Sequence, residues 1–142
     1  MPPVWLIAML FIAWWLGGLM PGLGFGYWAG LGGMFLIAGG AVLMGLAVLE
    51  FYRAKTTIIP GHAPDALITT GIFQYSRNPI YLADTMFLTG LILWWDAVLA
   101  APLVILFVWI IRLRFINHEE ARLQAAYPTA FAAYTNGTRR WL

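Results

Sequence analysis

The stretch YSRNPIY, residues 75–81, places an arginine, an asparagine and a proline in a row between two apolar runs. Asn78 is a favourable N-cap, and Pro79 fits the first position of a helix, where its missing amide and fixed φ angle cost nothing. A helix is therefore predicted to begin at Pro79. Its free amides, next to the guanidinium of Arg77, form a site that favours an anion.

Helix capping explains Asn78 and Pro79, but it gives no reason for the aromatic residues Phe73, Tyr75 and Tyr81 around the arginine. Asp84 follows Tyr81 by three residues and lies inside an apolar run. A carboxylate costs about 2.5–3.5 kcal/mol at the centre of a bilayer and less near its edge. Asp84 is therefore a candidate functional residue.

A second polar segment runs from residue 112 to the C-terminus and contains the adjacent acids Glu119 and Glu120. It is typical of an amphipathic interfacial helix, in which Glu119 and Arg122 can pair three residues apart. Because adjacent helical residues point about 100° apart, at most one acid faces this arginine, and the other is free to face the first polar segment. His118 beside them lacks a third ligand at usable spacing, so no metal site is predicted.

The elements that position these residues must be membrane helices. The chain has 142 residues, of which 62% are hydrophobic and only 10% are charged, with a mean hydropathy of +0.80, whereas soluble domains are roughly 25% charged. This composition indicates an integral membrane protein. The net charge of +2 is small and scattered, which excludes a nucleic-acid-binding surface. The absence of cysteine excludes disulfides, thiolate metal sites and a cysteine nucleophile.

About 20 apolar residues are needed to cross a bilayer as a helix. The sequence contains four candidate spans, at Val4–Met20, Trp28–Leu49, Ile80–Trp95 and Ala97 to about Ile116. Only Asp96 separates the last two, which predicts a tight helical hairpin. The expected fold is an all-α polytopic membrane protein with about four transmembrane helices, this hairpin and a cytoplasmic, interfacial C-terminal helix.

Basic residues flank the middle loop and follow the fourth span, while the other two turns have none. The positive-inside rule therefore places the middle loop and both termini in the cytoplasm. The N-terminus lacks a basic region and a cleavage site, so it is predicted to be a retained helix. A prokaryotic cytoplasmic membrane is the expected location.

Two further patterns concern helix packing and membrane anchoring. Tryptophans near the predicted span ends suit the headgroup layer, and they are Trp14, Trp15, Trp28, Trp94 and Trp95. Glycines recur every four residues and would permit a turn or a close helix approach, at Gly18, Gly22, Gly26 and Gly30. A nucleotide-binding G-x-G-x-x-G loop is disfavoured, because Tyr27 stands where the third glycine belongs.

The segments TTGIFQYSRNPIYLA and NHEEARLQAAYPTAFAAYTNGTRRWL resemble the isoprenylcysteine carboxyl methyltransferase and phospholipid methyltransferase group of membrane enzymes. The resemblance covers roughly the last 90 residues. The matching positions are Thr69, Gly71, Phe73, Arg77, Asn78, Pro79, Tyr81, Glu119, Glu120, Leu123, Tyr127, Tyr134, Arg139, Arg140 and Trp141. Two departures are Asn78 in place of the commoner histidine and YPTAF in place of F-G-x-x-Y.

The resemblance implies S-adenosylmethionine as methyl donor, bound in a cytoplasmic pocket, and a lipophilic acceptor that enters from the bilayer. The expected domain is a single unit of residues 1–142, with N-terminal transmembrane helices at 1–52 and a cofactor-binding core at 53–142. Together with the chemistry of the residues, the resemblance predicts Arg77, Asp84 and Glu120 as catalytic residues. The predicted cofactor-binding residues, from the resemblance and from the chemistry of the residues, are Gly71, Phe73, Tyr75, Arg77, Asn78, Pro79, Tyr81, His118, Glu119 and Glu120.

The physical chemistry of these residues agrees with that implication. A donor carboxylate suits Arg77, its ammonium suits Glu119 or Glu120, and adenine suits aromatic walls. An amine or phenol acceptor would need a base, for which Glu120 and Asp84 are available.

The sequence leaves two alternatives open. Membrane sterol and isoprenoid reductases, which use NADPH, resemble this group at a similar stretch, and here Tyr81 and Asp84 keep the Y-x-x-acid spacing. A non-enzymatic membrane scaffold is the other, in which the charged residues form only an interfacial salt-bridge cluster.

Overall fold

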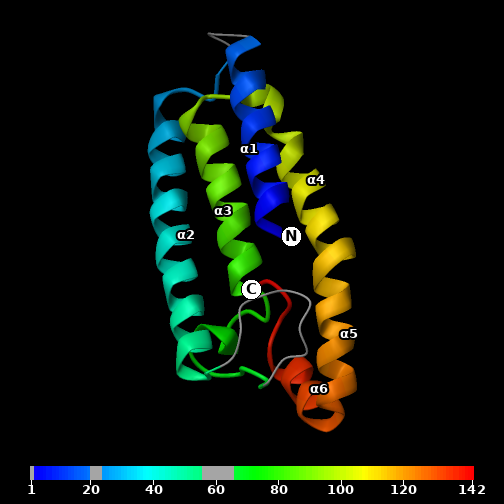
Figure 1. Ribbon diagram of the computed structural model, residues 1–142. Coiled ribbons are helices and arrows are strands. Elements are labelled where there is room, and N and C mark those ends of the chain that lie inside the picture. Colours follow the sequence, from blue (N-terminus) through cyan, green and yellow to red (C-terminus); the bar gives the residue numbers. More distant parts are fainter. Residues whose placement is uncertain (1, 20–23, 56–65) are drawn as a thin grey trace.

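The computed structural model describes residues 2–19, 24–55 and 66–142. Their elements are α1 (Pro2–Leu19), α2 (Tyr27–Arg53), η1 (Gly71–Gln74), α3 (Pro79–Trp94), η2 (Val98–Ala100), α4 (Pro102–Ile111), η3 (Arg112–Ile116), α5 (Asn117–Ala126) and α6 (Pro128–Gly137). The described ranges contain helices and no strand, so the predicted all-α class is confirmed. The helices α1, α2 and α3 and the continuous stretch from α4 to α5 run roughly parallel to one another and form the body of the molecule (Figure 1).

Three stretches are long and apolar enough to cross a membrane, namely Pro2–Leu19, Tyr27–Arg53 and Val98–Ala126. They agree with the polytopic membrane protein expected from the composition. The remaining predicted span, Ile80–Trp95, corresponds to α3, which is apolar but has only 16 residues. It is therefore about 24 Å long, shorter than the roughly 30 Å of a bilayer's hydrocarbon core. Contacts with other helices compensate for this short length, because α3 packs against α1, α2 and α4.

The close approach of α2 to α3 depends on glycine. A Cβ atom on Gly33 would lie 2.5 Å from the carbonyl oxygen of Gly90, so the two backbones leave no room for a side chain. The regular glycines of the sequence were predicted to permit a turn or a close helix approach, and the close approach occurs at other glycines. Gly18 and Gly30 face open space, and Gly26 instead forms a turn with φ of +87°; Gly22 lies outside the described residues.

The predicted turn at Asp96 joins α3 to η2 and α4. Asp96 has a positive φ of 56°, and its carboxylate accepts hydrogen bonds from the amides of Phe25 and Gly26 at the start of α2. The turn that follows α3 is thus tied to the turn that precedes α2. Although α3 and α4 are consecutive, α3 packs most extensively against α2.

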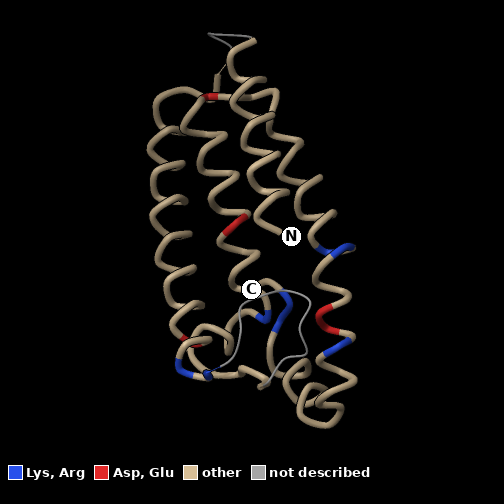
Figure 2. The backbone as a smooth tube through the Cα atoms, viewed as in Figure 1, with Lys and Arg blue, Asp and Glu red and all other residues tan. Residues whose placement is uncertain are grey.

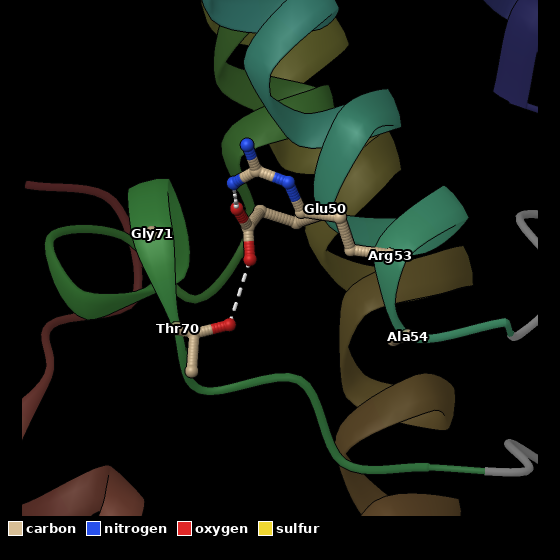
Figure 3. Close-up of a pocket in the computed structure, with 5 residues that line it drawn as sticks. All are labelled: Glu50, Arg53, Ala54, Thr70 and Gly71. Atoms are coloured by element: carbon tan, nitrogen blue, oxygen red, sulfur yellow. Dashed lines mark hydrogen bonds and ion pairs between the residues drawn. The ribbon is translucent and has the colours of Figure 1, made fainter.

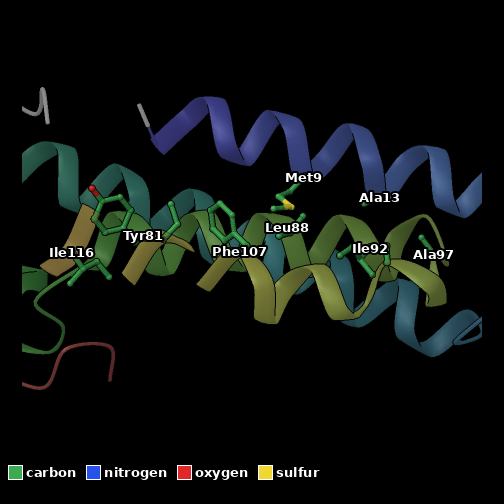
Figure 4. Packing of buried hydrophobic residues seen from close by; sticks show 10 residues of the cluster. Met9, Ala13, Tyr81, Leu88, Ile92, Ala97, Phe107 and Ile116 are labelled. Atoms are coloured by element: carbon green, nitrogen blue, oxygen red, sulfur yellow. The ribbon is translucent and has the colours of Figure 1, made fainter. Parts of the chain in front are cut away.

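The apolar core lies between α1, α3 and α4 (Figure 4). Leu88, Ile92 and Phe107 are almost completely buried there. Large apolar side chains elsewhere point outward, as for Phe35, which is 80% exposed. Lipid-facing helices are expected to expose such side chains. Four of the predicted tryptophan anchors are also exposed, whereas Trp95 packs against the core.

The C-terminal segment does not begin a new helix at Arg112. It continues α4 through a short π-helical stretch, η3, into α5, as one rod (Figure 1). The chain turns only at Tyr127, before Pro128 opens α6. Nothing in the sequence at Arg112 forbids continued helix, whereas a proline disfavours helical conformation in the residue before it. The separate C-terminal helix is therefore α6.

Charges gather at one end of the molecule. Lysine and arginine lie where α2 ends, where the C-terminal tail meets the start of α3, and along the rod of α4 and α5, and the opposite end of the described chain has none (Figure 2). Arg112 and Arg114 are exposed partway along the long rod of α4 and α5. Since exposed arginines avoid hydrocarbon, we expect this rod to leave the bilayer at about their level. The assignment of this end to the cytoplasm stays a prediction.

Candidate functional site

Arg77 and the acid pair come together at the charged end of the molecule. Arg77 Nη2 lies 3.6 Å from Glu120 Oε1, although the two residues belong to distant parts of the chain. Glu120 also accepts two hydrogen bonds from Arg140, one from Nε at 3.2 Å and one from Nη2. The side chains of Arg77 and Glu120 are 14% and 15% exposed. Two guanidiniums therefore share one largely buried carboxylate.

The C-terminal tail lies against the segment that opens α3. The amide of Arg77 donates to the carbonyl of Arg139 at 3.0 Å, and the side-chain amide of Asn78 donates to the carbonyl of Arg140 at 3.0 Å. These bonds place Arg140 next to Arg77. Sequence motifs in the tail included Arg140, but its pairing with Glu120 was not predicted, because that pairing requires the tail to fold back.

The start of α3 is confirmed at Pro79. The predicted capping role of Asn78 is wrong in its detail, since its side chain makes no cap hydrogen bond. Its side chain is instead turned to the C-terminal tail, where Nδ2 donates to the carbonyl of Arg140. Its own backbone amide donates to the hydroxyl of Ser76, which is buried.

Glu119 and Glu120 face different partners, as their helical spacing requires. Glu119 Oε1 accepts a 2.6 Å hydrogen bond from the hydroxyl of Tyr81, while Glu120 faces the arginines. Both acids therefore contact the first polar segment, where the sequence predicted that at least one would. No ion pair within 4 Å joins Glu119 to Arg122 in the described chain.

Asp84 lies one helical turn after Tyr81 on α3 and is only 6% exposed. Among the described residues it forms no hydrogen bond or ion pair, although it lies near enough to Tyr81 to interact electrostatically. Such an uncompensated buried carboxylate costs stability. Its position beside the Tyr81–Glu119 pair makes it part of the same cluster.

The predicted aromatic walls are only partly assembled. Phe73 is buried and packs edge to face on Phe51 of α2, with ring centroids 5.6 Å apart. Tyr75 is 68% exposed, and His118 is exposed as well. The structure thus brings Tyr81 to the acid pair and leaves Tyr75 and His118 at the surface.

Tyr134 of α6 holds the short helix η1 in place. Its hydroxyl donates to the carbonyl of Phe73 at 2.6 Å. Burial raises the pKa of Tyr134 to about 12, against a smaller lowering by Arg77. The phenol therefore stays protonated, and able to donate, across the physiological pH range.

A pocket of about 380 Å³ opens at the end of α2 (Figure 3). It is lined by Glu50, Arg53, Ala54, Thr70 and Gly71. Gly71, predicted to bind cofactor, lies here, apart from the contacts of Arg77. Glu50 was not predicted, although the signal existed: like Asp84, it is a carboxylate next to an apolar run, and it has an arginine three residues later.

A comparison with known protein families shows which family the chain belongs to. The family model described as phospholipid methyltransferase matches residues 28–130. The chain belongs to the phospholipid methyltransferase family. No curated protein and no solved structure matches it.

The family match runs from the first turn of α2 into α6, so it contains Arg77, Asp84, Glu119 and Glu120. Arg140 lies beyond it. Membership identifies the chain as a membrane protein of a methyltransferase family and agrees with the resemblance found in the sequence. The alternative of an NADPH-dependent reductase gains no support from the comparison.

Proposed function

We propose that this protein is an S-adenosylmethionine-dependent methyltransferase that acts on a lipophilic acceptor and binds its methyl donor around Arg77. The observation that carries the proposal is the junction of Arg77 with Glu120 at 3.6 Å, in a chain that belongs to a methyltransferase family. This junction brings both polar segments of the sequence to one place.

The charges around Arg77 fit the carboxylate of the donor. Arg77 and Arg140 supply two positive charges, and Glu120 balances only one of them. One further anion would balance the other. The Nε atom of Arg77 is buried and has no hydrogen-bond partner in the described chain. A buried donor left unpaired costs about 1–3 kcal/mol. A carboxylate bound by this guanidinium would remove that cost.

Glu119 is the better candidate for the ammonium group of the donor. Both oxygens of Glu120 already accept hydrogen bonds from Arg140. Glu119 instead accepts one neutral hydrogen bond from Tyr81 at its Oε1 atom. Since a carboxylate offers about four acceptor positions, Glu119 can take an ammonium without losing Tyr81. We therefore assign the ammonium to Glu119, and to Glu120 the task of holding the two arginines.

When bound, S-adenosylmethionine supplies an electrophilic methyl group on sulfur. The protein's part is to orient donor and acceptor and to exclude water, because closely aligned reactants need little other help. A carboxylate or thiolate acceptor needs no base. An amine or phenol must lose a proton, and Asp84, which forms no ion pair in the described chain, is a freer carboxylate for this task than Glu120.

The acceptor is proposed to enter from the bilayer. Asp84 and Tyr81 lie on the apolar helix α3, close to the polar cluster that would hold the donor. A lipophilic molecule with a reactive head group can reach this boundary while its tail remains among lipids. Prenylated cysteines, phospholipid amines and small hydrophobic thiols or acids all meet this description.

The test is calorimetric titration of S-adenosylmethionine into the purified protein in detergent micelles. Arg77→Ala and Glu119→Gln are expected to weaken binding by tenfold or more, since each loses a charge-assisted hydrogen bond worth about 1.5–3 kcal/mol. Arg139→Gln is the matched control, because this arginine is adjacent in sequence to Arg140 and its side chain is exposed.

Unchanged affinity in both site variants would remove the assignment of the donor site. A parallel titration with NADPH separates the reductase alternative, because a methyltransferase is expected to give no NADPH signal. Transfer of a radiolabelled methyl group into an organic-soluble product then identifies the acceptor class.

A further inference from the structure

We infer that Glu50 is a positioning residue of the candidate site: its carboxylate holds the turn at Thr70 and Gly71, and this turn fixes where Arg77 lies. The inference rests on the proposed function for its meaning in catalysis. Its structural part stands on the contacts of Glu50 alone.

Glu50 is a buried carboxylate with defined partners. It lies near the end of α2 and is 7% exposed. Oε1 pairs with Arg53 Nη1 at 3.0 Å, and Oε2 accepts a 2.7 Å hydrogen bond from the hydroxyl of Thr70 (Figure 3). Arg53 is largely exposed, at 64%, so the contact with Thr70 is the one that joins two segments of the fold.

The backbone at Gly71 is shaped around this carboxylate. Gly71 has φ of +57°, which favours glycine. A Cβ atom there would lie 2.5 Å from both the carboxyl carbon and Oε1 of Glu50. The turn therefore lies directly against the carboxylate, and any side chain at this position would have to displace the carboxylate.

From this turn the chain runs to Arg77 under restraint on both sides. Phe73 packs on Phe51 of α2, the residue after Glu50, and its carbonyl accepts from Tyr134 of α6. The amide of Arg77 donates to the tail at Arg139. If the bond between Glu50 and Thr70 is lost, the segment is held less firmly on α2 and depends more on its contacts with α6 and the tail. The orientation of the Arg77 guanidinium would then be less defined.

The 3.6 Å contact of Arg77 with Glu120 is long for an ion pair. A small displacement of the segment would therefore break it, and with it the arrangement proposed to bind the donor. A carboxylate that served only stability would lower the melting temperature and leave the affinity of the folded protein unchanged.

The first experiment measures donor affinity well below the melting temperature of each variant. Thr70→Val removes the hydroxyl and keeps the shape, while Thr70→Ser keeps the hydroxyl. We expect Thr70→Val and Glu50→Ala to raise the Kd for S-adenosylmethionine about tenfold, and Thr70→Ser to stay within about twofold. Thr135→Val is the matched control, since this threonine bonds only within α6.

The second experiment does not depend on the donor. The chain has no cysteine, so spin labels can be attached to cysteines introduced at Tyr75 and Phe35, which are 68% and 80% exposed. The distance distribution between the labels is expected to broaden in Thr70→Val and to stay narrow in Thr70→Ser. Thr70→Val keeps this test available where Glu50→Ala fails to fold.

The outcomes separate the two claims. Wild-type affinity and a narrow distance distribution in Thr70→Val would overturn the positioning role. A broadened distribution in that variant, together with no binding of S-adenosylmethionine by the wild-type protein, would support the positioning of the segment and refute the proposed function.

Discussion

The hydrogen bond between Tyr81 and Glu119 offers a sharp test of how α3 and α5 are joined. Tyr81 is 6% exposed, and its hydroxyl donates to Glu119 Oε1 at 2.6 Å. Tyr81→Phe removes this donor and keeps the ring, so no large cavity forms. The change therefore isolates one polar contact between two helices.

The expected magnitude depends on the charge of the acceptor. A hydrogen bond to a charged group is worth about 1.5–3 kcal/mol, whereas neutral bonds between membrane helices average about 0.6 kcal/mol. Glu119 is half-buried, so water can reach it and partly replace the lost donor. We therefore expect a loss of about 1–2 kcal/mol in the free energy of unfolding.

The assay is a double-mutant cycle with Tyr81→Phe, Glu119→Gln and the double variant, each unfolded by titration with a denaturing detergent. A coupling energy of at least about 1 kcal/mol is expected. Tyr52→Phe is the matched control, because this tyrosine is 82% exposed and no change in stability is expected. Coupling below about 0.3 kcal/mol would show that the contact does not join the helices in solution.

Three further changes test the fold. Asp96→Ala should lower the melting temperature, because the amides at the start of α2 lose their acceptor; an unchanged melting temperature would refute that tie. Gly90→Leu should prevent stable folding, because even a Cβ atom at this position would lie 2.8 Å from a backbone oxygen. Gly45→Ala is the control, since Gly45 faces open space and the change should be tolerated or slightly stabilising. Circular dichroism compares the helix content of the two variants. Tyr134 has a pKa of about 12 in the folded protein against an ordinary value of 10, so its contribution to stability is complete below pH 10 and lost as pH rises through 12. Tyr134→Phe should remove that part of the alkaline loss in a pH series of melts, and an identical series would contradict it.

The helices could be predicted from the sequence because they depend on local chemistry. Apolar runs of sufficient length predicted the membrane helices, because a helix satisfies its own backbone in lipid. Pro79 predicted the start of α3, and the spacing of Glu119 and Glu120 predicted that they point to different sides. The junction of the arginine with the acids also followed, since both segments lie at the same predicted water boundary.

The details that depend on distant contacts were decided by the tertiary structure. The side chain of Asn78 binds the C-terminal tail, and the sequence offered it an equally good partner in its own helix. Gly33 and Gly90, rather than the regular glycines before them, bring α2 and α3 together, because the register of the two helices selects the contact.

The sequence by itself determined that this protein is a helical membrane protein with one charged end, since composition and hydrophobic length depend only on the order of residues. Only the tertiary structure decided that Glu120 pairs with Arg77 and Arg140, while Glu119 accepts a hydrogen bond from Tyr81. Buried charges need partners, but which partner each finds depends on how α3, α5 and the tail pack together.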